Sequence, residues 1–210
     1  MKTIVITGGP CSGKTSAISI LRERLAQAGV PAVFVAEAGT DLILAGTTPD
    51  TLGSMAAFQT QVAALQVERE ANAKEQARCM EANPTTSPTN AEVLIICDRG
   101  ICDGAAYVGP EEYLQVLHDN KLDANTVMDR YDAVFCLEST AKLATGAYTT
   151  ANNTARSETP EEAAALDDRT SKAWEQHPHF YFIHNQDCFD KKANALFRAL
   201  QSFLEQELIN

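Results

Sequence analysis

The chain has 210 residues, 45% of them hydrophobic, a formal net charge of -11 and a sequence pI near 4.8. This length and composition predict a single domain over residues 1–210 with one filled core, and the acidic charge disfavours a nucleic-acid partner. No run approaches the roughly 18 apolar residues of a membrane span, and the first residues follow a strand pattern in place of a signal peptide, so we expect a cytoplasmic protein.

The predicted elements alternate between strand and helix from the beginning of the chain. The run "KTIVIT" (2–7) predicts a strand, and apolar residues at helical spacing over 16–29 predict a helix that Gly29 ends. A second apolar run from residue 30 predicts a strand that ends near Glu37. These three elements form a strand–helix–strand unit, which indicates parallel strands.

Helical sequence then extends over about 51–82 and is ended by "NPTTSPTN". Three more apolar runs, "EVLIICDRG" (92–100), "YDAVFCLES" (131–139) and "HFYFIHN" (179–185), predict further strands, and 190–208 predicts a closing helix. Strands that are apolar throughout are buried on both sides. The sequence therefore predicts an α/β fold, a five-stranded parallel sheet with helices on both faces.

A phosphate-binding loop follows the first predicted strand and begins the first predicted helix. Gly8, Gly13, Lys14 and Thr15 satisfy the pattern GxxxxGK[ST]. Glycines let backbone N–H groups turn inward, the helix presents its positive dipole end, the lysine reaches the β- and γ-phosphates, and the threonine hydroxyl reaches magnesium. An accidental glycine-rich turn is the alternative. We expect a nucleoside triphosphate, with Mg²⁺, to contact Gly8, Gly9, Pro10, Cys11, Ser12, Gly13, Lys14, Thr15 and Ser16.

Acidic residues stand at the carboxyl ends of the other predicted strands, where ligands of parallel sheets bind. Asp98 follows four apolar residues, and we expect it in the magnesium shell, with a turn cap as the alternative. Glu37 is a candidate general base for a substrate hydroxyl, or else a helix cap. Arg99 either clamps substrate or phosphate or pairs with a surface carboxylate. For Glu138 we expect a structural hydrogen-bonding role.

The polar segment at about 140–176 is too long for an ordinary connection, and we expect it to be a helical lid over the triphosphate. Arg156 and Arg169 are the candidates for a lid arginine that contacts phosphate. A solvated helix over 160–176 is the alternative. Trp174 is expected to anchor this segment in the core.

The cysteines are not expected to be zinc ligands. The six cysteines are scattered without a CxxC pair and are interpreted as reduced thiols. Cys11, in the phosphate loop at a helix N-terminus, is either a thiol of lowered pKa or a residue small enough to fit the loop.

The chain resembles the AAA-domain family of P-loop proteins that includes NadR-type nicotinamide-riboside kinases and related ATPases, and that is related to deoxynucleoside and nucleoside-monophosphate kinases. The resemblance rests on "TGGPCSGKTS", "EAGTDLI", "DRGICDGAAY", "RYDAVFCLE", "RSETPEEAAALDDRTSKAWEQHP" and "FIHN". Together these motifs extend over most of the chain. The resemblance implies a P-loop NTPase fold.

The resemblance also implies roles for individual residues. It gives Lys14 and Thr15 to phosphate and magnesium, places Asp98 and Arg99 in a DR motif, and puts Glu37 where related deoxynucleoside kinases have their base. It further implies that the lid supplies arginines and that Asn185 borders the nucleotide base.

These expectations combine into a hypothesis about function. The sequence predicts a kinase that binds ATP and Mg²⁺ and transfers the γ-phosphoryl group to a small-molecule acceptor, a nucleoside, nucleotide or vitamin riboside. The alternative is a nucleotide-binding NTPase switch or regulatory module, using ATP or GTP, without a small-molecule acceptor.

Overall fold

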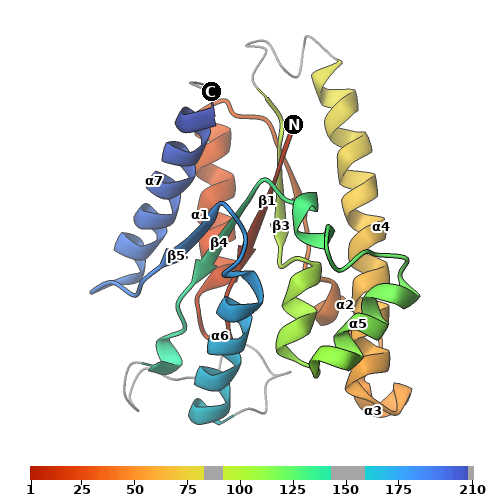
Figure 1. The fold of residues 1–210 in the computed structure, drawn as a ribbon. Coiled ribbons are helices and arrows are strands. Elements are labelled where there is room, and N and C mark those ends of the chain that lie inside the picture. The colour runs from red at the N-terminus through yellow and green to blue at the C-terminus, as the bar shows by residue number, and fades with distance from the viewer. Residues whose placement is uncertain (83–91, 143–158, 208–210) are drawn as a thin grey trace.

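A central parallel sheet organises the chain (Figure 1). The computed structural model describes residues 1–82, 92–142 and 159–207. Its five strands are paired in the order β2-β3-β1-β4-β5, and every pair is parallel. The strands are β1 (Lys2–Thr7), β2 (Ala32–Val35), β3 (Leu94–Asp98), β4 (Ala133–Leu137) and β5 (Phe180–Ile183). The predicted α/β fold with a five-stranded parallel sheet is confirmed.

The strand order determines where a ligand can bind. β3 lies between β1 and β2, with Ile6 of β1 opposite Asp98 of β3. After β1 the chain forms β2 and β3 on one side of this strand. It then crosses to the other side, where it forms β4 and β5. In open parallel sheets, ligands bind at the carboxyl ends of the strands where the direction of winding changes. The carboxyl end of β1 is therefore the expected position of the site.

Helices cover both faces of the sheet, as predicted. α1 and α7 lie side by side on one face, and α4, α5 and α6 lie on the other (Figure 1). The helices are α1 (Lys14–Gln27), α2 (Ala38–Leu44), α3 (Pro49–Leu52), α4 (Met55–Glu81), α5 (Pro110–Asp119), α6 (Pro160–Trp174) and α7 (Phe189–Glu207). Three short 3-10 helices are η1 (Ile101–Ala106), η2 (Val127–Arg130) and η3 (Thr140–Lys142).

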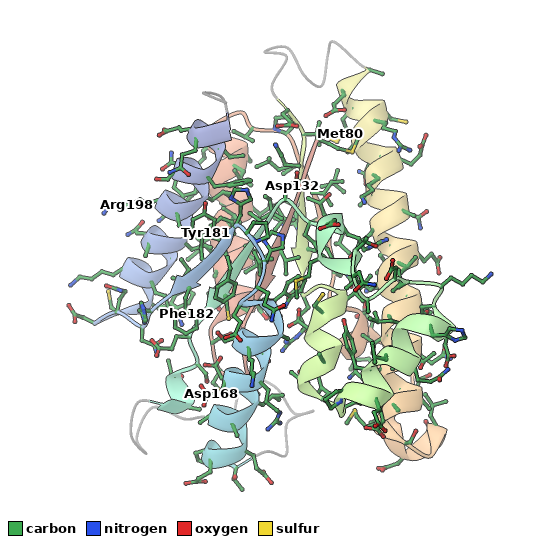
Figure 2. The ribbon with its side chains drawn as sticks, in the orientation of Figure 1. Met80, Asp132, Asp168, Tyr181, Phe182 and Arg198 are labelled. Carbon is green, nitrogen blue, oxygen red and sulfur yellow. The ribbon has the colours of Figure 1, made fainter. Side chains whose placement is uncertain are left out.

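The core has one apolar cluster on each face of the sheet. Alternate residues of β1 divide between them: Ile4 and Ile6 pack with α1 and α7, and Val5 packs with α4, α5 and α6. Tyr181 of β5 (Figure 2) stacks on Phe135 of β4 at 4.8 Å between ring centroids. Ile4, Val5 and Ile6 of β1 are fully buried. Burial on both faces is the reason that the strand sequences are apolar throughout.

Trp174, the last residue of α6, has no exposed surface and belongs to the apolar cluster that contains Val5. Its prediction as a core anchor is confirmed.

One predicted element differs from the structure. The helical sequence expected over about 51–82 is the end of α3 followed by α4, because Gly53 adopts a left-handed φ of 80° after α3 and ends it. Ser54 then begins α4, where its side chain accepts a hydrogen bond from Ala57 N at 3.0 Å. The surrounding sequence is rich in helix-forming alanine, so the break was not predicted. The pair Gly53-Ser54, a helix end followed by a helix start, was the local indication of it.

Two predicted segments lie wholly or partly outside the described residues: "NPTTSPTN" (83–90), and 143–158 of the expected lid, which includes Arg156. Across 1–82, 92–142 and 159–207, no helix has the length and apolar character needed to cross a membrane.

Candidate functional site: a phosphate loop and an adjoining chamber

The loop between β1 and α1 adopts the conformation expected of an anion-binding turn. Gly8, Cys11 and Gly13 have φ values of 148°, 59° and 81°. Gly13 is the N-cap of α1, and no side chain caps this end of the helix. The first N–H groups of α1, which have no partner within a helix, are therefore suited to an anionic ligand.

Three successive carbonyls of the loop are held by donors from distant parts of the chain. Thr140 Oγ1 donates to Cys11 O at 3.0 Å, and Lys192 Nζ donates to Ser12 O at 2.8 Å. Ser139 Oγ donates to Pro10 O. A trans peptide directs its carbonyl and its N–H in opposite directions. Anchoring these carbonyls therefore turns the N–H groups of the following residues the other way.

Lys192 is a buried cation beside the loop. Its side chain is 3% exposed, and besides Ser12 O it donates to Glu138 O and, at 2.9 Å, to Asn185 Oδ1. Burial lowers the pKa of Lys192 from 10.5 to about 8, although Asp167 and Glu138 oppose this effect. Its three acceptors match the three donors of a protonated lysine.

Helix α6 contacts the loop directly through Asp167. The buried Asp167 carboxylate accepts hydrogen bonds from Gly9 N at 2.8 Å and from Ser139 N at 3.2 Å. A Cβ on Gly9 would lie 2.6 Å from the Cβ of Asp167. Glycine at position 9 is thus what allows α6 to approach the phosphate loop so closely.

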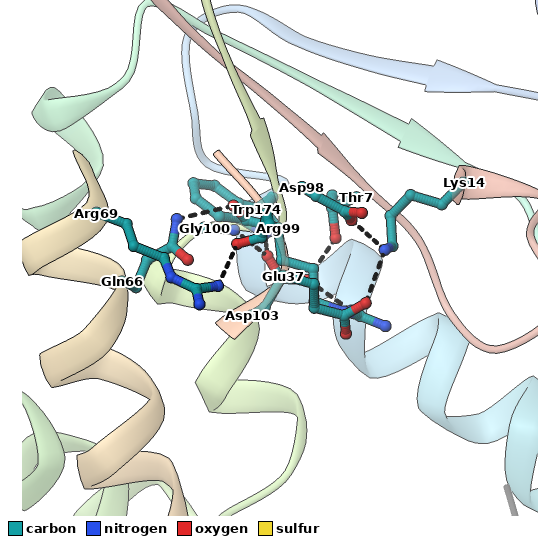
Figure 3. A network of polar contacts seen from close by, with 11 residues as sticks. Thr7, Lys14, Glu37, Gln66, Arg69, Asp98, Arg99, Gly100, Asp103 and Trp174 are labelled. Carbon is teal, nitrogen blue, oxygen red and sulfur yellow. Dashed lines mark hydrogen bonds and ion pairs between the residues drawn. The ribbon is translucent and has the colours of Figure 1, made fainter. Parts of the chain in front are cut away.

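Lys14 lies between two carboxylates at the carboxyl edge of the sheet (Figure 3). Its Nζ is 3.2 Å from Glu37 Oε2 and also donates to Asp98 Oδ1. Glu37 occupies the N-cap position of α2, but its side chain makes no capping hydrogen bond. Asp98 ends β3 and uses its carboxylate on Lys14. The helix-cap alternative for Glu37 is therefore wrong, and Asp98 lies within reach of the phosphate loop.

The two carboxylates differ in protonation behaviour. Burial alone would raise the pKa of Glu37, but Arg99 and Lys14 outweigh it and lower this pKa from 4.5 to about 2. Burial raises the pKa of Asp98 above its ordinary 3.8, with Glu37 adding to the effect and Lys14 opposing it. Glu37 is therefore the carboxylate more firmly held in its charged form.

Arg99 holds Glu37 from the other side. Its Nε donates to Glu37 Oε1 at 2.8 Å and its Nη1 donates to Asp103 Oδ1 at 2.9 Å. Arg99 has a left-handed φ of 69°, an uncommon conformation for a residue with a side chain. Backbone contacts with Ile6 O and Gln66 Nε2 hold it there. Strain of this kind is frequently found at functional sites.

Asp103 is the buried carboxylate that orients Arg99. It also accepts hydrogen bonds from Gly100 N at 2.9 Å, from Trp174 Nε1 at 3.1 Å and from Thr7 Oγ1. Figure 3 shows Asp103 with Trp174, Gly100 and Thr7 in one network with Arg99 and Glu37. A fully hydrogen-bonded buried carboxylate is a rigid support, because each lost partner would leave a polar atom unpaired.

A second buried acid, Glu70, supports the site from α4. Its carboxylate accepts hydrogen bonds from Tyr131 Oη at 2.7 Å, Gln66 Nε2 at 3.1 Å and Arg130 Nη2 at 2.8 Å. Gln66 is the same amide that donates to Arg99 O, at 3.3 Å. This network links the long helix α4 to the backbone that carries Arg99.

A cavity of about 910 Å³ opens at the phosphate loop and continues beyond Glu37 and Arg99. Its loop end is lined by Gly9, Pro10, Cys11, Ser12, Gly13, Lys14, Thr15 and Ser16. The other end, which we call the chamber, lies between α2, α3 and α4 on one side and η1 and α5 on the other. Apart from Gly8, the expected ligand-binding residues of the loop thus border one space together with Glu37, Asp98 and Arg99.

Three residues predicted to bind the nucleotide are not among the described residues that line this cavity: Gly8, Arg169 and Asn185. Gly8 lies behind the loop, where a Cβ would be 2.4 Å from Leu137 O. Arg169 is exposed, and its Nε donates to Ala106 O at 2.8 Å. Asn185 donates to Ser139 O at 3.0 Å, and its backbone N–H donates to Glu138 Oε2 at 2.8 Å. Glu138 has the hydrogen-bonding role expected of it.

Sequence reasoning missed two groups of residues. Some line the cavity, and the others hold the elements around it: Gln59, Gln66 and Asp103, and Glu70, Asp167 and Lys192. Asp103 had a local signal, because an acidic residue three positions after Gly100 can close a turn. The others had none, since each is a polar residue in a helix whose burial depends on its tertiary neighbours.

A family model described as "AAA domain" matches residues 3–191. No curated protein matches the chain. Metal-binding clusters of three or more His, Cys, Asp or Glu side chains do not occur within residues 1–82, 92–142 and 159–207. None of the six cysteines, all of which the structure describes, forms a disulfide.

Proposed function

The chain belongs to the AAA-domain family of P-loop nucleotide-binding proteins, and from this premise we propose that it is an Mg²⁺-dependent kinase. It transfers the γ-phosphoryl group of ATP to a small hydroxylated metabolite, a nucleoside, nucleotide or vitamin riboside. The observation that carries this proposal is the continuity of the cavity. The ribose and base of a nucleotide extend from its α-phosphate. A protein that only binds or hydrolyses a nucleotide therefore needs no compartment beyond the γ-phosphate, on the side of Glu37, whereas a kinase needs one there for its acceptor.

Magnesium fits the residues at the loop. The exposed Thr15 lies in the first turn of α1, and Asp98 ends the adjacent strand β3, so that both border the cavity. Mg²⁺ in such sites takes one or two protein oxygens and completes its shell with phosphate oxygens and water. Thr15 and Asp98 would hold the ion, which supplies positive charge to the β- and γ-phosphate oxygens.

Lys14 couples phosphate binding to the state of Glu37. Phosphate oxygens compete with the two carboxylates for the same ammonium group, and a triphosphate carries more negative charge than either carboxylate. As Lys14 moves to the phosphates, Glu37 loses one of the two cations that lower its pKa, and its affinity for a proton rises. The base is thus strengthened when the substrate is in place.

The transfer then balances in one step. The acceptor hydroxyl gives its proton to a Glu37 carboxylate oxygen as its own oxygen forms a bond to the γ-phosphorus. The bond from the γ-phosphorus to the bridging oxygen breaks, and ADP leaves with the bond electrons. Arg99 holds Glu37 Oε1 throughout, so the carboxylate keeps its orientation after Lys14 has moved.

ADP release in the presence of ATP and Mg²⁺ tests the proposal. A panel of nucleosides, nucleotides and vitamin ribosides is added singly, with GTP in place of ATP in a parallel series. A kinase releases ADP faster with its acceptor and forms a phosphorylated product of matching amount. If nucleotide is consumed at one slow rate whatever compound is added, and only a partner protein changes that rate, the switch is the better description.

A further inference from the structure

The chamber beyond Glu37 has apolar walls. Side chains from α2, α4, η1 and α5 line it: Ile43, Met55, Phe58, Val62, Ile101 and Val116. Phe58 is 5% exposed and Val116 is 2% exposed, so the inner walls belong to the packed interior, whereas Ile43 and Met55, 36% and 37% exposed, stand at the rim. Apolar walls of this kind bind flat or aliphatic surfaces and disfavour ionic groups that must give up water.

The charges around the cavity are unsuited to a second anionic ligand. Among the described residues that line it, Lys14 and Arg99 are the only lysine or arginine side chains, whereas Glu37, Asp41, Asp98 and Asp103 supply four carboxylates. Arg99 is committed to Glu37 and Asp103, and Lys14 is the cation that a nucleotide phosphate would take. An acceptor that already carries a phosphate would therefore meet carboxylates without a cation of its own.

Gln59 offers a hydrogen-bonding edge inside these apolar walls. The residue is 5% exposed and lines the chamber. Its Nε2 lies 3.8 Å from Met55 Sδ, a weak acceptor, and its Oε1 has no hydrogen-bond partner among the described residues. Buried amides are ordinarily paired, so this one is suited to a ligand. Gly104 keeps the space open, because a Cβ there would lie 3.3 Å from Gln59 Oε1.

The spacing along α4 places Gln59 at the far end of the chamber from the phosphates. Gln66, seven residues later on the same helix face, donates to Arg99 O and marks the phosphate end. Seven residues of α-helix span about 10 Å, which leaves room for a sugar and one ring system between them. Val62 lies between the two glutamines and lines the same space.

We propose that the chamber takes an unphosphorylated, neutral or cationic riboside, with its flat heteroaromatic ring between the apolar walls and a ring-edge donor or acceptor paired with Gln59, and that it rejects the corresponding monophosphate. The sugar hydroxyl points to Glu37. This inference rests on the proposed kinase function for the identity of the chamber, and it narrows the acceptor from nucleosides, nucleotides and ribosides to those without a phosphate.

Binding in the presence of saturating ADP and Mg²⁺, which occupy the phosphate loop without a γ-phosphoryl group to transfer, tests the inference separately from catalysis. Isothermal titration measures the affinity for four nucleosides and for nicotinamide riboside, which carries a positive charge, and then for the 5′-monophosphate of each. At least one riboside should bind, and its monophosphate should bind roughly tenfold or more weakly, because the lining carboxylates already occupy the nearby cations and leave none for a second phosphate. A monophosphate that binds as well as its riboside, or a panel with no binding riboside, overturns the inference.

Two α4 variants locate the contact. Gln59→Leu should weaken riboside binding roughly tenfold, since one buried hydrogen bond is lost, and should leave ATP affinity unchanged. Gln61→Leu is the matched control, because Gln61 is exposed on the same helix and does not line the cavity. Equal effects of the two variants, with both folded by circular dichroism, would remove Gln59 from the site.

The two proposals fail in different ways. A riboside that binds and discriminates against its monophosphate, but never speeds ADP release, leaves the chamber inference in place and contradicts the kinase. A phosphorylated acceptor that speeds ADP release supports the kinase and contradicts the chamber inference.

Discussion

The Nζ atom of Lys14 lies 3.2 Å from Oε2 of Glu37, which joins the lysine of the phosphate loop to the carboxylate expected to act as base. The two residues come from different strand ends that the sheet places at one edge. Because Lys14 also contacts Asp98, two carboxylates share this cation in a partly buried place, and Arg99 is the second cation on Glu37. Any ligand that draws Lys14 away changes the electrostatics of both.

Removing the lysine should separate binding from folding. Lys14→Ala is expected to weaken ATP binding roughly tenfold or more, because charge-assisted hydrogen bonds to the phosphates are lost. Turnover should disappear, while circular dichroism stays that of the parent protein. The control is Lys172→Ala, on the exposed face of α6. Unchanged ATP affinity and turnover in Lys14→Ala would contradict the phosphate-loop assignment.

Neutralising the base should affect transfer much more than nucleotide binding. Glu37→Gln keeps the size of the side chain and removes its charge, so acceptor phosphorylation should fall on the order of 100-fold while ATP affinity barely changes. Slow background hydrolysis should persist. Glu68→Gln, exposed on α4, is the matched control. A collapse of ATP affinity in Glu37→Gln would instead make Glu37 part of the nucleotide site.

The same variant has a pH signature. The pKa of Glu37 is lowered from 4.5 to about 2 in the folded protein. The unfolded chain therefore binds a proton first as pH falls, and the free energy of unfolding drops between about pH 4.5 and pH 2. The stabilising contribution of the charged Glu37 carboxylate is fully present above pH 4.5. Urea unfolding over this range should show a smaller acid loss of stability for Glu37→Gln than for the parent.

Lys192 should make nucleotide binding sensitive to alkaline pH. As pH rises above about 8, its amine loses a proton and keeps two donors for three acceptors, so the hold on Ser12 O weakens. ATP affinity of the parent should decrease between pH 7.5 and 9.5 by roughly threefold to tenfold, the value of one hydrogen bond. Lys192→Met should bind ATP more weakly at pH 7.5 and lack this step.

Stability should change in the opposite direction. Between pH 8 and pH 10.5 the folded chain holds fewer protons at Lys192 than the unfolded chain, so the free energy of unfolding rises with pH relative to Lys192→Met. Lys191→Met is the control, because Lys191 is the exposed neighbour on α7. If the parent and Lys192→Met share one pH profile for ATP affinity, the lysine does not hold the loop.

The contact between α6 and the loop should contribute to both stability and binding. Asp167→Ala leaves Gly9 N and Ser139 N without their acceptor, and we expect the free energy of unfolding to fall by about 1–3 kcal/mol. ATP binding should also weaken, because the loop is less firmly held. Asp168→Ala, at the exposed neighbouring position (Figure 2), should have a smaller effect on both quantities.

A glycine variant provides an independent check of the same contact. Gly9→Ala should reproduce the binding defect of Asp167→Ala, since its Cβ would overlap the Asp167 side chain. Parent-like ATP affinity in both variants would show that α6 does not position the loop.

The sequence by itself determined the five strands, the first and last helices and the phosphate loop. These features are local: a buried strand is recognised from consecutive apolar residues, and the loop pattern spans eight neighbouring residues from Gly8 to Thr15. It also placed Glu37 and Asp98 at strand ends, because their positions follow directly from where the apolar runs stop. This reasoning overlooked the break at Gly53, a single residue in helical sequence, and the helices α2 and α5.

Only the tertiary structure decided which polar residues meet. Glu37 and Arg99 are 62 positions apart, Gly9 and Asp167 are 158 apart, and Ser12 and Lys192 are 180 apart. Alternating strands and helices are compatible with several strand orders, and only the insertion of β3 between β1 and β2 brings Asp98 beside Lys14. Burial of Gln59, Asp167 and Lys192 likewise depends on the elements packed against them, which no local pattern specifies.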